Sequence, residues 1–305
     1  MEAISRRGVR DPKGELKQVL SVSRRTDIPA FYMPWFMDQV AREQVAVLHP
    51  FTRQIRQVPL SPRRVHTLVF WSKNFGPFLA GGYGEQLRAL GYRLFFNFTI
   101  NSGLPMLEPG VPALEQRIDQ LGRLCQQFGS ESVQWRFDPI CHFTSPSGVV
   151  KTNLDHFKRI AAAAAGCGIG LCLTSFMDHY RKIRRRSLNR LTFVEPLPDQ
   201  QTTLLLKLER TLAPLGIQLA LCCEKEALGR LPADSTIVSG ACISGHRIMA
   251  LHGGRVSLRQ DPGQRKASGC GCTVSTDVGS YPLHPCHHNC LFCYANPACD
   301  QRSPP

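Results

Sequence analysis

The chain has 305 residues, of which 43% are hydrophobic and 20% charged, a composition typical of globular proteins with a sizeable core. It contains no long uncharged apolar run, and residues 1–7 lack the apolar core of a signal peptide, so we expect a cytoplasmic protein that does not span a membrane. The 13 cysteines favour metal ligands over disulfides in that compartment, and the formal net charge of +14 favours a polyanionic partner such as nucleic acid.

Short apolar runs that end in turn-forming residues predict strands along the first 221 residues. They lie at 18–23, 45–49, 53–60, 67–71, 92–99, 132–140, 169–175 and 216–221. Amphipathic segments such as 114–128 separate several of them, which indicates βα units around a parallel sheet. We therefore expect an α/β fold, namely a complete or partial TIM-like (β/α) barrel, with an open doubly wound sheet as the alternative.

Charged residues follow three of these predicted strands. Arg24 and Asp27 come after the first, Lys73 follows the strand at 67–71, and Arg136 and Asp138 lie in the second half of the segment at 132–140. A barrel gathers such strand ends at the mouth that carries its active site. For each residue the competing interpretation is a structural ion pair or, for the lysine, a side chain that reaches solvent.

Near the end of the chain, Cys286, Cys290 and Cys293 have the spacing C-x3-C-x2-C. Three thiolates so spaced can bind three irons of a [4Fe–4S] cluster and leave the fourth iron open. Zinc is the competing metal, because nearby histidines also ligate zinc, namely His284, His287 and His288. The composition changes at residue 222, so we divide the chain into a barrel at 1–221 and a cysteine-rich, metal-binding segment at 222–305, packed on the barrel mouth within one structural unit.

The other cysteines of this segment predict a second metal site. Only one glycine separates Cys270 from Cys272, and its conformational freedom lets both thiolates turn toward one metal. Cys223, just past the last predicted strand, and Cys242 are the candidates to complete four ligands, with Cys222 packing beside them or substituting for one. We expect an auxiliary [4Fe–4S] cluster or zinc that holds the segment against the barrel, and ordinary buried thiols are the alternative.

Several motifs in a fixed order resemble a known family. They lie at 23–31, 70–74, 135–139 and 270–295, and together they resemble the bacterial domain-of-unknown-function family numbered 1848 over residues 19–296. That family implies no activity beyond a cysteine cluster likened to that of radical S-adenosylmethionine (SAM) enzymes. The C-x3-C-x2-C loop, with an aromatic residue before its third cysteine, is similar to the cluster loop of that superfamily. There the open iron binds SAM, whose reductive cleavage gives a 5′-deoxyadenosyl radical.

A weaker similarity connects Ser72 and Lys73, residues 98–109 with Arg117, and residues 136–140 to barrel segments of spore photoproduct lyase and its relatives, in which the cysteine loop comes first. The resemblance implies a radical SAM enzyme with a C-terminal cluster loop, an unknown substrate, and an electron donor such as flavodoxin or ferredoxin. Alternatives are a nucleic-acid repair or modification enzyme and a non-enzymatic zinc or redox-sensing protein. We expect Lys73 and Arg136 to bind SAM or substrate anions, and the remaining strand-end residues to act as acid, base or orienting groups, namely Arg24, Asp27 and Asp138.

Overall fold

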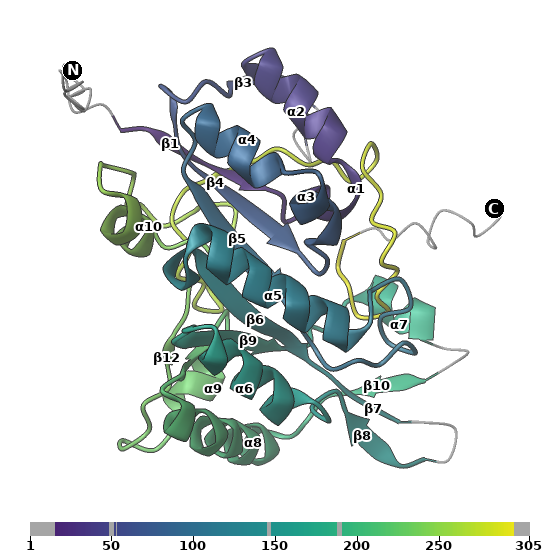
Figure 1. The fold of residues 1–305 in the computed structure, drawn as a ribbon. Coiled ribbons are helices and arrows are strands. Elements are labelled where there is room, and N and C mark those ends of the chain that lie inside the picture. The colour runs from purple at the N-terminus through teal and green to yellow at the C-terminus, as the bar shows by residue number, and fades with distance from the viewer. Residues whose placement is uncertain (1–15, 49–51, 53, 145–147, 188–190, 296–305) are drawn as a thin grey trace.

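The computed structural model describes residues 16–48, 52, 54–144, 148–187 and 191–295. Its centre is an eight-stranded sheet with the order β12-β11-β9-β6-β5-β4-β1-β13, in which every neighbouring pair is parallel (Figure 1). Seven of its strands are β1 Gln18–Val22, β4 Val65–Ser72, β5 Leu94–Thr99, β6 Val133–Ile140, β9 Leu171–Phe176, β11 Gln218–Leu221 and β12 Val238–Ser239. The eighth, β13 Thr276–Asp277, comes from the cysteine-rich segment.

The strand order shows that the sheet winds in one direction. From β1 to β12 each strand lies beside the next parallel strand along the chain, as in a barrel and without the reversal of a doubly wound sheet. Among the described residues, the edge strands β12 and β13 pair with no partner that would close the sheet. The α/β prediction is therefore confirmed, whereas the complete barrel is not seen and the sheet is open.

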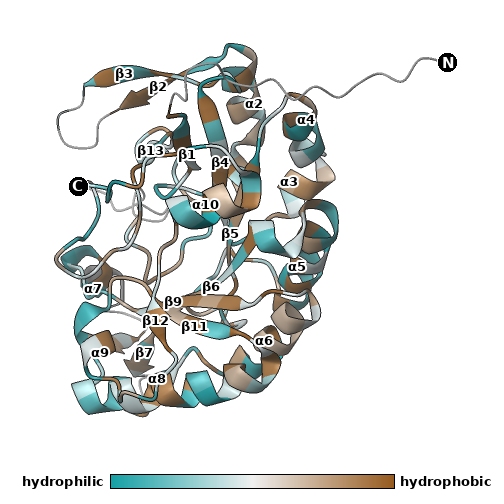
Figure 2. Ribbon diagram, turned by 90° about the vertical axis from the view of Figure 1, so that its left-hand side faces the viewer, coloured by the Kyte–Doolittle hydropathy of each residue, from teal (hydrophilic) through white to brown (hydrophobic). Residues whose placement is uncertain are grey.

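Helices cover one face of this sheet and form an arc around the strands (Figure 2). The main core lies between these two layers. All residues of β4 and β5 are buried, which explains their continuous apolar runs in the sequence. The covering helices are α1 Ile28–Phe31, α2 Met33–Ala41, α3 Gly76–Ala80, α4 Tyr83–Ala89, α5 Leu114–Phe128, α6 Phe157–Gly166 and α8 Pro198–Leu212.

The cysteine-rich segment covers the other face. A second core joins side chains such as Val69 and Phe95 of the sheet to Ile248 of α10 (Gly245–His252) and to four buried cysteines, Cys222, Cys242, Cys270 and Cys272. Residues 222–295 thus add strands and an apolar core of their own to the sheet. No helix in the described part of the chain is long and apolar enough to cross a membrane.

The remaining elements lie at the edges of the sheet. An antiparallel hairpin joins β2 (Gln44–Leu48) to β3 (Ile55–Pro59). A three-stranded sheet has the order β10-β7-β8, with α7 (Arg181–Ser187) immediately before β10 in the chain. Its strands are β7 His142–Thr144, β8 Val150–Thr152 and β10 Thr192–Val194. A short helix, α9 Lys225–Gly229, follows β11 in the chain.

Candidate functional site

The loop that carries Cys286, Cys290 and Cys293, here called the cysteine loop (residues 286–293), lies against the carboxyl ends of β1 and β4. Its His288 is almost fully buried, with Nε2 2.7 Å from Asp27 Oδ2 and Nδ1 3.0 Å from the carbonyl oxygen of Gly110. The backbone N–H of Gly110 in turn donates to the carbonyl of His288. One buried histidine therefore fastens the loop to two parts of the sheet's carboxyl edge.

Asp27 is the acceptor that organises this edge. Its Oδ1 accepts the backbone N–H of Ala30 and so caps α1. Its Oδ2 accepts the Ser72 hydroxyl at 2.9 Å and the Lys73 backbone N–H at 2.9 Å, besides its contact with His288. Both carboxylate oxygens are thus engaged, and Asp27 connects β1, β4 and the cysteine loop.

Lys73 points toward the cysteine loop. Its Nζ lies 2.6 Å from Glu108 Oε1 and 5.2 Å from the ring centre of Phe292. Burial alone would lower the pKa of Lys73, but Glu108 and Cys290 together raise it, so the ammonium form is favoured. The Lys73 ammonium group thus lies beside a loop cysteine. It can bind an anionic group there while it also stays paired with Glu108.

A second group of strand-end residues surrounds Trp71 of β4. The guanidinium of Arg24 lies 5.2 Å from the indole ring centre and that of Arg136 lies 4.9 Å from it. Arg136 is paired with Asp138, which also accepts the Ser175 hydroxyl. Two buried donor atoms, Arg24 Nη2 and Arg136 Nε, have no hydrogen-bond partner within the described structure. These are the polar groups best placed to bind an anion at the sheet edge.

The structure brings all five predicted strand-end residues to this edge, in two groups. Asp27 and Lys73 adjoin the cysteine loop, whereas Arg24, Arg136 and Asp138 gather around Trp71. Tyr294, directly after the loop, joins the groups because its O–H donates to the backbone carbonyl of Arg24 at 2.9 Å, and this tyrosine is 47% exposed.

The loop thiols lie close enough to influence one another. Burial raises the pKa of the Cys290 thiol well above its ordinary value, and Cys286 and Cys293 raise it further, against the effect of Lys73. The three neighbouring histidines have protein partners: besides His288, His284 Nδ1 lies 3.2 Å from the Ser280 amide nitrogen, and His287 Nε2 lies 3.4 Å from Tyr32 Oη. Of these three histidines only His288 has contacts at both ring nitrogens within the described structure, so the three thiols and the second ring nitrogens of His284 and His287 are the candidate metal donors here.

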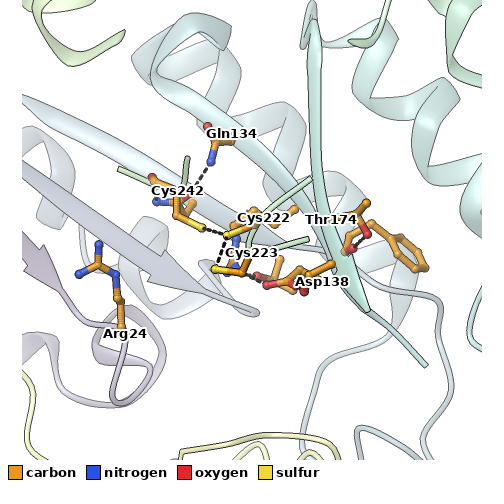
Figure 3. Close-up of polar contacts among 12 residues, drawn as sticks. Arg24, Gln134, Asp138, Thr174, Cys222, Cys223 and Cys242 are labelled. Carbon is orange, nitrogen blue, oxygen red and sulfur yellow. Dashed lines mark hydrogen bonds and ion pairs between the residues drawn. The ribbon is translucent and has the colours of Figure 1, made fainter. Parts of the chain in front are cut away.

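Five other cysteines gather on the inner face of the sheet, which is the face that the cysteine-rich segment covers. We call them the thiol ring: Cys222, Cys223, Cys242, Cys270 and Cys272. The sulfur of Cys222 lies 3.8 Å from that of Cys223 and 3.6 Å from that of Cys242 (Figure 3). Cys270 and Cys272 lie in the same apolar core as Cys222 and Cys242, and Cys223 packs against that core. The four cysteines predicted to form a second site therefore lie in one part of the fold, together with Cys222.

Neither cysteine group is preformed as a metal site, with its sulfur atoms arranged around one common centre. Among the described residues, no set of three or more His, Cys, Asp or Glu side chains is arranged to hold a metal ion as it stands. The two hollows of about 470 and 590 Å³ that open on the surface are lined by other residues, at Ser61 to Arg63 and at Asn74 to Pro77. Metal binding at either group therefore requires thiol protons to leave and side chains to adjust.

Sequence reasoning missed the roles of three residues that build this edge, of which only His288 had been named, as a possible zinc ligand. Glu108 pairs with Lys73, and His288 holds the loop. Asp277 of β13 accepts hydrogen bonds from Ser21, Ser23 and the backbone N–H of Arg24 at 2.6–2.8 Å. The available signal was weak: each is a lone charged or polar residue among turn formers, and its partner lies far away in the sequence.

Comparison with protein families gives one finding. The model of a family described as a domain of unknown function, DUF1848, matches residues 19–295, which includes every strand of the main sheet except the first residue of β1, and all eight C-terminal cysteines discussed above. A search of curated proteins gives no match.

Proposed function

The chain belongs to the DUF1848 family, and from that premise we propose that it is an iron–sulfur enzyme of the radical SAM type, with Cys286, Cys290 and Cys293 as ligands of a [4Fe–4S] cluster. The observation that carries the proposal is the fastening of a C-x3-C-x2-C loop by His288 to Asp27, at the carboxyl edge of a one-directional parallel sheet. Enzymes built on such sheets place their reactive groups at that edge.

The residues present fit such a cluster. Three thiols supply three iron ligands. His288, which could otherwise ligate zinc, has both ring nitrogens engaged, by Asp27 and by the carbonyl oxygen of Gly110. When bound and reduced, the cluster supplies one electron that splits SAM into methionine and a 5′-deoxyadenosyl radical. That electron comes from outside, so the proposal includes a low-potential donor such as flavodoxin or ferredoxin.

The strand-end residues bind and orient in this proposal. Lys73 offers its ammonium group to a carboxylate next to Cys290, with Glu108 holding the lysine end in place. Arg24 and Arg136 offer their unpartnered nitrogens to a SAM or substrate anion across the face of Trp71. Buried thiols and aromatic rings around the site exclude water from the reacting groups of a bound substrate.

The first experiment replaces Cys286, Cys290 and Cys293 together by alanine and reconstitutes the protein with iron and sulfide without oxygen. We expect loss of the visible and electron-paramagnetic signals of a cubane cluster. The matched control is Cys172→Ala, a buried cysteine on the helix-covered face of the sheet, which should keep the full signal. A full cluster signal in the triple variant would refute the ligand assignment.

The second experiment asks whether reduced, loaded protein converts SAM to 5′-deoxyadenosine. Wild type should form this product and the triple variant should not. Lys73→Ala should lower the rate at limiting SAM more than at saturating SAM, because a binding group is lost. If protein with a complete, reduced cluster leaves SAM intact, the radical SAM assignment is wrong.

A second candidate function, action on nucleic acid, is favoured by one observation. Ile183 of the basic helix α7 packs in the same apolar cluster as Cys290, Leu291 and Phe292, so this helix lies beside the cysteine loop. Arg181 and other basic side chains of this helix are exposed. A basic surface next to a reactive loop suits a polyanionic substrate.

This candidate predicts salt-dependent binding of a single-stranded oligonucleotide. Arg181→Glu together with Lys182→Glu should weaken binding at least tenfold at low salt and lower the slope of log affinity against log salt by about two, since each lysine or arginine neutralises about one phosphate. The control is charge reversal at exposed Arg123 of α5, outside the cysteine-loop cluster. Equal effects at both places would mean that the charge acts without a defined site.

A further inference from the structure

The thiol ring is a built feature of the fold. Cys222 and Cys223 follow β11, Cys242 follows β12, and Cys270 and Cys272 come from the loop that leads to β13. The ring therefore joins three separate stretches of chain on the inner face of the sheet. Four of its five cysteines are buried in one core with apolar side chains such as Val69, Leu173 and Ile243.

The backbone is shaped to present these sulfurs. Cys223 has a positive φ of 62°, a conformation that non-glycine residues seldom adopt. Gly271 packs on Gly240, whose carbonyl oxygen would lie 3.0 Å from a side-chain carbon at position 271. The backbone carbonyl of Cys242 accepts a hydrogen bond of 3.0 Å from Asn97 of β5. The close contact between Gly271 and Gly240 places Cys242 next to the chain that carries Cys270 and Cys272. The hydrogen bond from the Asn97 side chain fixes Cys242 to the sheet.

The surroundings suit a negatively charged group of sulfurs. The backbone N–H of Ile243 donates to Cys272 Sγ at 3.4 Å. Two buried cations face the ring, because Arg24 is within electrostatic reach of Cys272 and Cys242, and Arg136 of Cys242 and Cys222. Both arginines keep a donor nitrogen without a partner in the described structure. Four thiolates around a divalent ion carry two negative charges, and the two guanidinium groups supply positive charge nearby, where Arg136 also pairs with Asp138 and Arg24 lies 3.7 Å from Asp261.

The sulfur spacing distinguishes between metals. Two thiolates on one tetrahedral zinc lie about 3.8 Å apart, since each Zn–S bond is about 2.3 Å long. The separations of 3.8 Å and 3.6 Å at Cys222 match this spacing. The thiolates of a cubane bind different irons and lie farther apart. A disulfide bond is about 2.05 Å long, so none links these sulfurs.

We infer that the thiol ring is a second metal site, independent of the cysteine loop, which binds one zinc ion through four of its five thiols. Zinc replaces the thiol protons, and the S–H···S contacts give way to Zn–S bonds with small side-chain movements. Cys222 belongs to the donor set because its sulfur contacts those of both Cys223 and Cys242, which selects the second of the two roles that the sequence left open for it. The ion joins β11, β12 and the approach to β13.

The test measures zinc and iron in full-length protein purified without oxygen. The variant with Cys286, Cys290 and Cys293 replaced by alanine should lose its iron and keep about one zinc per chain, which separates this inference from the proposed function. Cys242→Ser with Cys272→Ser should lose the zinc, and Cys172→Ser should keep it. Iron with sulfide in place of zinc in the alanine variant, or no bound metal at all, would overturn the inference.

Cobalt gives a second measurement that does not depend on how stable the serine variants are. Adding Co²⁺ to metal-free alanine variant should produce the intense visible bands of tetrahedral cobalt with thiolate charge transfer, and should release protons to a pH indicator. Zinc added afterwards should remove the bands. Bands of six-coordinate cobalt, or a disulfide between ring cysteines found by mass spectrometry of the same sample, would contradict the assignment.

Discussion

Asp27 shows at the residue scale how a charged residue after a strand can hold neighbouring elements in place. The sequence predicted an acid, base or orienting group, and the structure gives its two oxygens four partners, among them His288 at 2.7 Å. A carboxylate that accepts hydrogen bonds from several elements at once holds those elements together. The geometry therefore favours the orienting role for Asp27, and a test of His288 tests the same contact from the loop side.

Replacing His288 by alanine should loosen the cysteine loop. The change removes both ring contacts and leaves a buried carboxylate with one partner fewer, at a cost of about 1–3 kcal/mol in unfolding free energy. We expect faster loss of iron to a chelator and a lower midpoint of thermal unfolding. The control is His287→Ala, because this neighbouring histidine is exposed and its ring contacts Tyr32, at 3.4 Å from Nε2, and the edge of Phe31. Equal iron loss in both variants would mean that His288 has no special anchoring role.

At the scale of elements, the loop containing Glu108 and Gly110 forms the seat of the cysteine loop. A side-chain carbon at Gly110 would lie 2.4 Å from the carbonyl oxygen of His287 and 2.8 Å from the Cα of His288. Backbone atoms cannot rotate away, so the two loops would have to separate. Gly110 thus sets how deeply the cysteine loop sits.

Gly110→Ala should lower the unfolding free energy by about 1–3 kcal/mol through this overpacking and should weaken iron retention at the cysteine loop. Gly122→Ala is the matched control, because it lies within α5 with nothing within 4 Å of the added carbon, and alanine there should stabilise by about 0.5–1 kcal/mol. Thermal unfolding and iron content are measured for both. If Gly110→Ala changes neither the thermal unfolding nor the iron content, the two loops accommodate the added carbon without strain.

Helix α10 docks through two histidines, the buried His66 of β4 and its own half-buried His252. His66 Nε2 lies 2.8 Å from the carbonyl oxygen of Gly253, and His252 Nε2 lies 3.1 Å from that of Leu94. Burial lowers the pKa of both histidines, and the charge of Arg93 lowers it further. The unfolded chain therefore binds more protons than the folded one as the pH falls below the ordinary histidine pKa, and folding becomes less favourable in acid.

The unfolding free energy should accordingly decrease as the pH is lowered from 7 to 5, with a slope of up to about 1.4 kcal/mol per pH unit for each histidine. His66→Gln with His252→Gln keeps an N–H donor and removes the titration, so the slope should become smaller. Denaturant titrations at each pH measure it. The control is His246→Gln on the exposed side of the same helix, which should leave the slope unchanged. An unchanged slope in the double variant would contradict the prediction.

At the scale of the whole molecule, the sequence predicted well what depends on local apolar pattern. The strands β1, β4, β5, β6, β9 and β11 are mostly buried short runs, and each was predicted within a few residues. Strand β13 has only two residues, and its pairing with β1 joins positions 256 residues apart, which no local pattern reports. Whether the sheet closes depends on such distant pairs.

The candidate sites divide in the same way. The cysteines were predictable because C-x3-C-x2-C and the Cys270–Cys272 pair are close-range patterns. Their partners were not, since His288 meets Asp27 across 261 residues and the arginines meet the thiol ring through Trp71. Contacts of this kind follow from the fold of the sheet, so they become visible only once strand order and register are known.

Asp277 joins these levels, because β13 lies in the chain between the thiol ring and the cysteine loop. Its carboxylate accepts the hydroxyls of Ser21 and Ser23, and the backbone N–H groups of Arg24 and Gly279. Hydrogen bonds to a charged group are the stronger ones, and here they hold a two-residue strand that has little other pairing. The C-terminal chain is therefore held to β1 largely through this residue.

Asp277→Asn keeps the shape and removes the charge, and it should lower the unfolding free energy by at least about 2 kcal/mol, since several charge-assisted bonds weaken together. Native-state hydrogen exchange should show faster exchange at β13 and in the cysteine loop, while α5 stays protected. Asp119→Asn, an exposed acid of α5 that pairs with Arg123, is the control and should change stability by less than about 0.5 kcal/mol. If exchange in the cysteine loop stays as slow as in wild type, the loop is held by its contacts with residues 107–110 and Asp27, and the fold does not couple it to the thiol ring through β13.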